Sequence, residues 1–282
     1  MSIELYNSVS FRTSDLITKR YSTSFSLAIR IFNPELRESI SSIYGYVRLA
    51  DEIVDSFHGY DKRSLLNELL NDTYSAMRNK ISLNPILHSF QSTVNKYDIP
   101  VEYINNFLES MAMDLDNNYY ERESYDKYIY GSAEVVGLMC LKVFCQNENE
   151  LFNSLIEPAK ALGSAFQKVN FLRDIKSDLN ERGRIYFPGG SNIEKINNLN
   201  KELLENEIEE EFRKALSGIK RLPNSSKPGV YSAYVYYYML FKKIRRMKVT
   251  DLFERRVRIS NLTKLTLLIR SLIKTKMINV IE

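Results

Sequence analysis

The chain has 282 residues, of which 44% are hydrophobic and 26% charged, an ordinary balance for a globular protein with a substantial core. Its two cysteines, Cys140 and Cys145, exclude a disulfide framework and a four-cysteine zinc site. Its two histidines, His58 and His88, leave little room for a histidine-rich metal centre or a histidine-based catalytic triad. If the protein is an enzyme, carboxylates and hydroxyls must therefore carry most of its chemistry.

The net charge of +4 hides an uneven distribution. Residues 242–282 contain 12 Lys and Arg against 3 Asp and Glu, whereas the rest of the chain contains 27 against 32. A basic segment of this kind is typical of contact with nucleic acid, anionic lipid or a phosphorylated ligand, and it also occurs as a solvated helix face. Charge alone leaves these interpretations open.

No stretch is expected to be a transmembrane helix or a signal peptide. The longest nearly apolar run, Val230 to Phe241, is shorter than the roughly 20 residues that span a bilayer. Residues 1–10 lack a basic cluster followed by an apolar core. These features favour a cytoplasmic protein with reduced thiols.

Helical periodicity dominates the chain, and strand alternation is scarce. The first helix is expected over 35–57, directly after Pro34, because apolar residues recur there at steps of three and four. Further helices, separated by Pro and Gly, are expected over about 62–80, 86–97, 101–117, 124–146, 150–180, 199–220, 229–248 and 260–279, with an irregular segment over about 181–198. No repeat or linker divides the chain, which favours a single all-α domain over 1–282.

Two pairs of aspartates, Asp51/Asp55 and Asp174/Asp178, are the only ones in the chain spaced four residues apart. Both pairs fall within expected helices, so each projects two carboxylates from one helix face. Such neighbours repel each other unless a cation lies between them. Oxygen donors of this kind suit Mg²⁺, which keeps waters and shares its shell with phosphate oxygens.

Polar residues extend each carboxylate stripe by a further turn. Arg48 stands three residues before Asp51, and Asn170 stands four before Asp174, both in otherwise apolar surroundings. The alternative is two exposed acidic turns that neighbouring basic residues neutralise.

Five sequence blocks occur in order along the chain: Tyr21–Ser26, Asp51–Asp55, Tyr128–Gly137, Asn170–Asp178 and Gly183–Pro188. In order and spacing they resemble the squalene and phytoene synthase family over roughly residues 18–260, and the nearest likeness is to the bacterial phytoene synthase branch.

The resemblance implies an all-α isoprenoid (terpenoid) synthase fold, a single helical bundle around a central apolar cavity. It implies a prenyltransferase of the phytoene synthase type, which joins two geranylgeranyl diphosphates head to head through cyclopropylcarbinyl (prephytoene) diphosphate in the first step of carotenoid biosynthesis. Two or three Mg²⁺ ions, for which Mn²⁺ can substitute, are implied as cofactors, and no NADPH is expected.

The resemblance also implies roles for individual residues. The metal ligands it implies are Asp51, Asp55, Asn170, Asp174 and Asp178. Tyr44 and Tyr128 match tyrosines near the reacting carbons and join the four aspartates as implied catalytic residues. The residues implied at the diphosphate are Ser22, Ser24, Arg48, Asn170, Arg173, Tyr237, a supporting Gln167, and Arg256 of the basic segment.

Other interpretations stay open. The same chemistry on two farnesyl diphosphates gives dehydrosqualene or, with NADPH, squalene. A remote alternative is a non-enzymatic helical binding module that uses residues 242–282 on nucleic acid. The leading interpretation predicts two prenyl diphosphate substrates and no nucleic-acid partner, and it allows peripheral contact of residues 242–282 with the inner face of a membrane. The oligomeric state is open.

Overall fold

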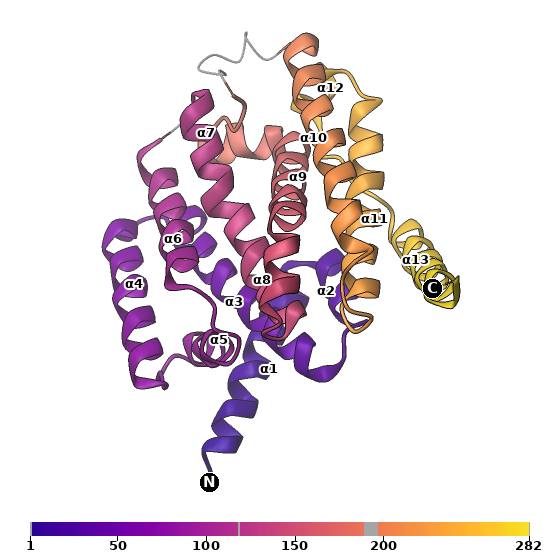
Figure 1. Ribbon diagram of the computed structural model, residues 1–282. Coiled ribbons are helices and arrows are strands. Elements are labelled where there is room, and N and C mark those ends of the chain that lie inside the picture. Colours follow the sequence, from indigo (N-terminus) through magenta and orange to yellow (C-terminus); the bar gives the residue numbers. More distant parts are fainter. Residues whose placement is uncertain (1, 118, 189–196, 282) are drawn as a thin grey trace.

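The computed structural model describes residues 2–117, 119–188 and 197–281, with side chains through residue 273. Among these residues there is no strand, only an isolated bridge between Tyr119 and Ile185, so the expected all-α class is confirmed (Figure 1). The elements are α1 (Ile3–Tyr21), α2 (Thr23–Ile29), α3 (Pro34–Asp55), α4 (Lys62–Asn79), α5 (Pro85–Lys96), α6 (Val101–Asp116), α7 (Arg122–Ile129), the π-helical η1 (Tyr130–Glu134), α8 (Val135–Cys145), α9 (Asn149–Arg182), α10 (Asn198–Ile219), α11 (Lys227–Arg245), α12 (Val249–Glu254) and α13 (Asn261–Ile281).

Asparagine caps begin several of these helices. The Asn33 side chain accepts a hydrogen bond from the Leu36 amide at 2.9 Å, and Pro34 occupies the first turn of α3. The same Asn-Pro arrangement begins α5. The 34-residue α9 ends at Gly183, whose φ of +66° is a conformation that glycine adopts without steric cost. This reversal returns the following residues to the bundle beside α3.

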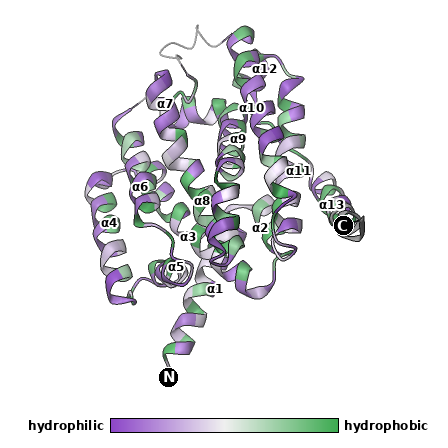
Figure 2. Ribbon diagram, viewed as in Figure 1, coloured by the Kyte–Doolittle hydropathy of each residue, from purple (hydrophilic) through white to green (hydrophobic). Residues whose placement is uncertain are grey.

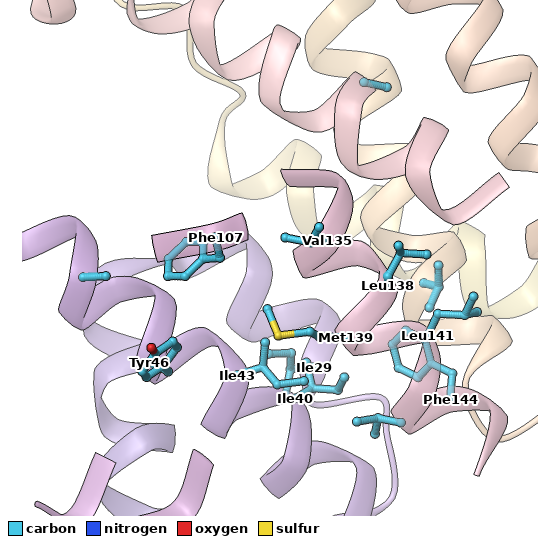
Figure 3. Packing of buried hydrophobic residues seen from close by; sticks show 14 of the residues in the cluster. Ile29, Ile40, Ile43, Tyr46, Phe107, Val135, Leu138, Met139, Leu141 and Phe144 are labelled. Atoms are coloured by element: carbon cyan, nitrogen blue, oxygen red, sulfur yellow. The ribbon is translucent and has the colours of Figure 1, made fainter. Parts of the chain in front are cut away.

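The core is a continuous apolar cluster that draws residues from α2 to the segment after α12. Figure 3 shows Met139 of α8 beside Ile40 and Ile43 of α3, all at most 1% exposed. The Tyr46 ring stacks on Phe90 of α5 with centroids 3.9 Å apart. Each such side chain stabilises the fold by about 1.5–3 kcal/mol through burial. Outer helices such as α4 carry interspersed hydrophilic and hydrophobic residues (Figure 2).

No helix was expected before residue 35, so α1 and α2 were not predicted from the sequence. The reason is that the buried face of α1 consists of hydroxyl residues, Ser10, Ser14 and Thr18, rather than apolar ones. Ser14 Oγ lies 2.8 Å from Ser89 Oγ of α5, and both hydroxyls are buried. A search for apolar periodicity cannot detect a helix that packs through small hydroxyls.

The helix expected over 124–146 is the continuous run α7–η1–α8, and α12 lies beyond the helix expected over 229–248. In the irregular segment, residues 183–188 are indeed not helical, and 189–196 lie outside the described residues.

Among the residues searched, Arg122–Cys145 is long and apolar enough to cross a membrane by length and composition, with a mean hydropathy of 1.4 over 18 residues. The sequence-based expectation that no stretch is long and apolar enough considered only uninterrupted apolar runs, and it therefore overlooked this window, in which polar residues are interspersed. Because 61% of this window is buried among the other helices, packing within the bundle accounts for its apolar character.

The approach of α9 to η1 makes Gly163 a sensitive position. A Cβ atom at Gly163 would lie 2.5 Å from the Ala133 carbonyl oxygen. We expect Gly163→Ala to lower the free energy of unfolding by about 1–3 kcal/mol, because the clash outweighs the gain in helix propensity of roughly 1 kcal/mol. Urea unfolding measures this change, and the matched control is Asn153→Ala at an exposed position of α9. If the Gly163→Ala protein is as stable as the control, then α9 and η1 can move apart enough to accept the added methyl group at little cost.

Candidate active site

A cavity of about 820 Å³ lies inside the bundle, near the upper end of the range of about 300–1,000 Å³ that ligand pockets span. Its walls come from α2, α3, α6, α7, η1, α8, α9, α10, α11, the residues after α12, and the adjoining ends of α1 and α13. Along α9 the lining changes from apolar between Leu155 and Phe166 to polar between Gln167 and Arg182. Since α9 rises about 1.5 Å per residue, the cavity is long, with one polar end and one apolar end.

The two aspartate pairs meet at the polar end. Asp51 and Asp55 come from α3, and Asp174 and Asp178 from α9. Arg182 joins the two helices, because its Nε lies 3.3 Å from Asp55 Oδ2 and its Nη1 lies 2.5 Å from Asp178 Oδ1. The four side chains are only 10–33% exposed, so the alternative of two exposed acidic turns is wrong.

For part of this acidic cluster, the neighbouring guanidinium groups do not offset the cost of burying the carboxylates. Burial raises the pKa of Asp51 to about 7, with Arg48 opposing the shift and the nearby Asp55 carboxylate adding to it. Burial likewise raises the pKa of Asp178 to about 7. At Asp174 burial is outweighed by the guanidinium groups of Arg173 and Arg256, and the pKa is lowered. A cation would therefore be stabilised most beside Asp51 and Asp178.

The donor set fits Mg²⁺ shared with a phosphorylated ligand. In the part of the chain that the structure describes, no three carboxylate, thiol or imidazole side chains lie close enough together to hold a metal by themselves. Mg²⁺ seldom needs such a cage, because one or two carboxylates, substrate phosphates and waters complete its octahedron. The side chains that would hold it are the four aspartates, with Asn170 one turn before Asp174 on α9.

The other residues implied by the resemblance lie on the walls of this same cavity. They are Ser22, Ser24, Tyr44, Arg48, Tyr128, Gln167, Asn170, Arg173, Tyr237 and Arg256. The structure thus brings together residues more than 230 positions apart in the sequence, between Ser22 and Arg256. Their individual roles in binding and catalysis stay predictions.

Local contacts hold several of these side chains in place. Ser22 caps α2 through a 3.1 Å hydrogen bond from the Phe25 amide. The Tyr237 hydroxyl donates to Asn170 Oδ1 at 3.3 Å, and the Tyr237 ring stacks on Phe166 at 3.9 Å. Burial raises the pKa of Tyr44 to about 12, so its hydroxyl keeps its proton at neutral pH.

Asp114 of α6, which was not predicted from the sequence, is a buried carboxylate on the cavity wall and is 8% exposed. Three tyrosine hydroxyls donate to it: those of Tyr120 and Tyr186 reach Oδ1 at 2.7 Å, and that of Tyr128 reaches Oδ2 at 2.8 Å. The sequence did contain a pattern that indicates burial of Asp114, because this residue falls three positions after the buried Met111, on the same face of the helix. A carboxylate at a core position of a helix indicates a partner or a function.

Arg184, also missed, connects Asp114 to the first aspartate pair. The reversal at Gly183 brings its Nη1 to 2.7 Å from Asp55 Oδ1 and 3.6 Å from Asp114 Oδ2. Arg184 also donates to the Tyr186 hydroxyl at 3.2 Å. Both residues lie in one of the blocks that carried the resemblance, but that block suggested no role for either. Only the chain reversal after α9 reveals their position.

Chemically, the polar end combines carboxylates that can share a divalent cation with basic side chains that can bind phosphate oxygens. The basic side chains on the cavity wall are Arg48, Arg173, Arg182, Arg256, Arg258 and Lys264. The apolar end suits a long hydrocarbon chain. An amphiphile with an anionic head and an apolar tail matches this arrangement in both charge and shape.

Comparisons with known proteins agree with this geometry. The family model described as squalene/phytoene synthase matches residues 18–263. The 15-cis-phytoene synthase of Pantoea ananas is 32% identical over 223 residues, which cover 75% of this chain and 69% of that protein. A phytoene synthase of Arthrospira platensis is 26% identical over 268 residues, which cover 85% of each chain.

Solved structures confirm the expected isoprenoid synthase fold. A dehydrosqualene synthase in complex with a ligand superposes with a TM-score of 0.81 at 21% identity, covering 96% of this chain and 98% of that one. A squalene synthase from Alicyclobacillus acidocaldarius superposes with a TM-score of 0.75 at 21% identity, covering 87% and 96%. Together with the cavity and its aspartate pairs, these matches show that the chain belongs to the squalene/phytoene synthase family, whose members are prenyltransferases.

Proposed function

We propose that this protein is a phytoene synthase, which condenses two geranylgeranyl diphosphates head to head through prephytoene diphosphate to phytoene. The observation that carries the proposal is one long cavity with two facing aspartate pairs at its polar end and an apolar remainder. The curated relatives that cover most of the chain and are named phytoene synthases support the choice of a C20 substrate over a C15 one.

The diphosphate groups would occupy the polar end, where Arg48, Arg173 and Arg182 supply guanidinium donors. Mg²⁺, when bound, neutralises the charge that develops on a departing diphosphate. The protein's own contribution is to hold the carboxylates and guanidinium groups in place before the substrate arrives, so that little reorganisation accompanies charge separation.

The apolar part of the cavity would hold the hydrocarbon chains and exclude water from a cationic intermediate. Ile29, Phe32 and Phe144 are among its lining residues. Cys140 also lines the cavity, and burial raises the pKa of its thiol to about 12. The thiol therefore stays protonated and is a poor nucleophile toward an allylic cation.

Aromatic faces near the polar end supply a further means of stabilising positive charge. The rings of Phe25, Tyr44, Tyr128 and Phe171 line the cavity, and Phe25 packs on Tyr44 with centroids 5.0 Å apart. Each face directed at a cation stabilises it by about 0.5–2 kcal/mol.

Product analysis tests the substrate and the reaction together. We expect geranylgeranyl diphosphate and Mg²⁺ to give phytoene without NADPH, and farnesyl diphosphate to be used less efficiently. The measurement is extraction and identification of the hydrocarbon formed from each radiolabelled diphosphate, with and without NADPH. Squalene formed only with NADPH, or dehydrosqualene as the main product, would replace the C20 assignment by the farnesyl alternative.

The aspartate pairs can be tested by single substitutions. We expect Asp51→Asn or Asp178→Asn to lower kcat for diphosphate release at least about a hundredfold, since each removes charge that the bound cation requires. The matched control is Asp126→Asn, which removes an exposed carboxylate that pairs with Arg122 outside the cavity. Thermal unfolding verifies that all variants fold. Near-normal turnover in Asp51→Asn and Asp178→Asn would contradict the proposed metal site.

Asp114 is expected to act as a positioning residue through Tyr128. Because misplacement by about 1 Å can cost roughly a hundredfold in rate, Asp114→Asn should lower kcat on that order and leave KM nearly unchanged. Tyr120→Phe is the control, because it removes another donor to Asp114 from a ring that does not line the cavity. Steady-state kinetics and thermal midpoints are compared. An equal loss of kcat in Tyr120→Phe would mean that the cluster acts only through stability.

A further inference from the structure

An apolar stripe lies uncovered along α13. Leu262, Leu265, Ile269 and Ile273 are spaced three, four and four residues apart, so they share one face of the helix. Their exposed fractions are 76%, 49%, 50% and 55%. Four large apolar side chains in register on a solvent-facing helix indicate an interaction surface rather than scattered exposure.

The opposite face of α13 packs on the bundle. Ser271 is 2% exposed and its hydroxyl lies 2.5 Å from that of Ser232 in α11. Lys264 donates to Thr23 of α2 at 3.1 Å and lies over the Tyr236 ring of α11. The helix thus lies on the outside of the bundle beside α11 (Figure 1), and its stripe is exposed to solvent.

The stripe begins at the rim of the cavity. Asn261 and Lys264, in the first turn of α13, line the cavity, as do Arg258 and Ile259 just before it. Leu262 and Leu265 follow Asn261 and Lys264 directly in the sequence. The stripe therefore begins beside exposed residues at the polar end of the cavity, such as Arg258 and Asn261.

The charge around the stripe has one sign. Residues 255–281 contain 7 Lys and Arg and no Asp or Glu. Arg255, Arg258 and Arg270 are exposed, and so is Arg256, which pairs with Asp174. An exposed apolar stripe on a helix in a basic segment is the pattern of helices that lie in the interface of an anionic membrane.

We propose that α13 docks this protein on an anionic lipid bilayer. The four apolar side chains enter the boundary between headgroups and acyl chains, and the exposed guanidinium groups of Arg255, Arg258 and Arg270 contact lipid phosphates. In this orientation the rim of the cavity lies at the membrane surface. A hydrocarbon product could then pass into the bilayer without crossing water, a consequence that rests on the proposed function, whereas the docking itself does not.

Two other occupants fit the surface less well. A second copy of the chain, bound through the same face about a two-fold axis, would place one basic helix against another, and like charges would repel. Nucleic acid would use the basic side chains but leaves an exposed Leu and Ile stripe without a partner, since phosphate contacts are electrostatic.

Flotation of the full-length protein with vesicles tests the proposal. The vesicles are phosphatidylcholine alone or a mixture of phosphatidylcholine and phosphatidylglycerol. We expect binding to the mixed vesicles, weakened by salt, and little binding to phosphatidylcholine alone. The Leu265→Ser/Ile269→Ser variant should partition roughly tenfold or more weakly, because two apolar side chains no longer enter the interface.

The matched control is Leu5→Ser/Val9→Ser on α1, which removes apolar side chains that are 49% and 45% exposed and distant in sequence from the cavity rim. We expect this variant to float like the unmodified protein, and circular dichroism verifies that both variants fold. Equal loss of binding in the two variants, or no binding of the unmodified protein, would overturn the proposal. Self-association that only the α13 variant abolishes would assign the stripe to a second copy instead.

Turnover of detergent-dispersed substrate separates this proposal from the proposed function. Leu265 and Ile269 do not line the cavity, so the α13 variant should retain its activity in detergent while losing flotation. Flotation that depends on α13 in a protein that makes no phytoene would leave the docking standing and overturn only the function.

Discussion

The burial of like charges on two helices is the constraint on which the rest of the site depends. Asp55 of α3 and Asp178 of α9 face one another inside the bundle, and such carboxylates are stable there only with a positive partner. Arg182 supplies one from the end of α9, and Arg184 supplies another after the reversal at Gly183. The length of α9 and the way it ends are therefore parts of the site.

The same electrostatic requirement organises the wall of the cavity. Asp114 reaches low exposure because three tyrosine hydroxyls and Arg184 satisfy its oxygens, and this ties α6, α7 and the segment after α9 together. The tyrosine and phenylalanine rings that surround it keep water out while presenting polarisable faces to the cavity. A polar network and an aromatic wall thus support each other at the end where charge would develop in the proposed reaction.

The position of α13 gives the molecule one face that differs from the others in charge and hydrophobicity. Its basic, apolar-striped face begins where the cavity opens, on a chain whose remaining residues carry a net negative charge. A molecule with this distribution can meet an anionic surface in one orientation, with the cavity rim toward it. The chemistry at the polar end and the transfer of an apolar product would then be arranged around one opening.

Local sequence was enough to predict the all-α class, most helix positions from residue 35 onward, and the two aspartate pairs, because periodicity and i,i+4 spacing are local properties. It could not reveal α1, whose buried face of Ser10, Ser14 and Thr18 carries no apolar signal. Nor could the sequence show that Asp114 lies beside Arg184, or that the apolar stripe of α13 faces solvent. Those features depend on which helix faces meet, and only tertiary packing decides that, since a buried charge is defined by neighbours that lie far away along the chain.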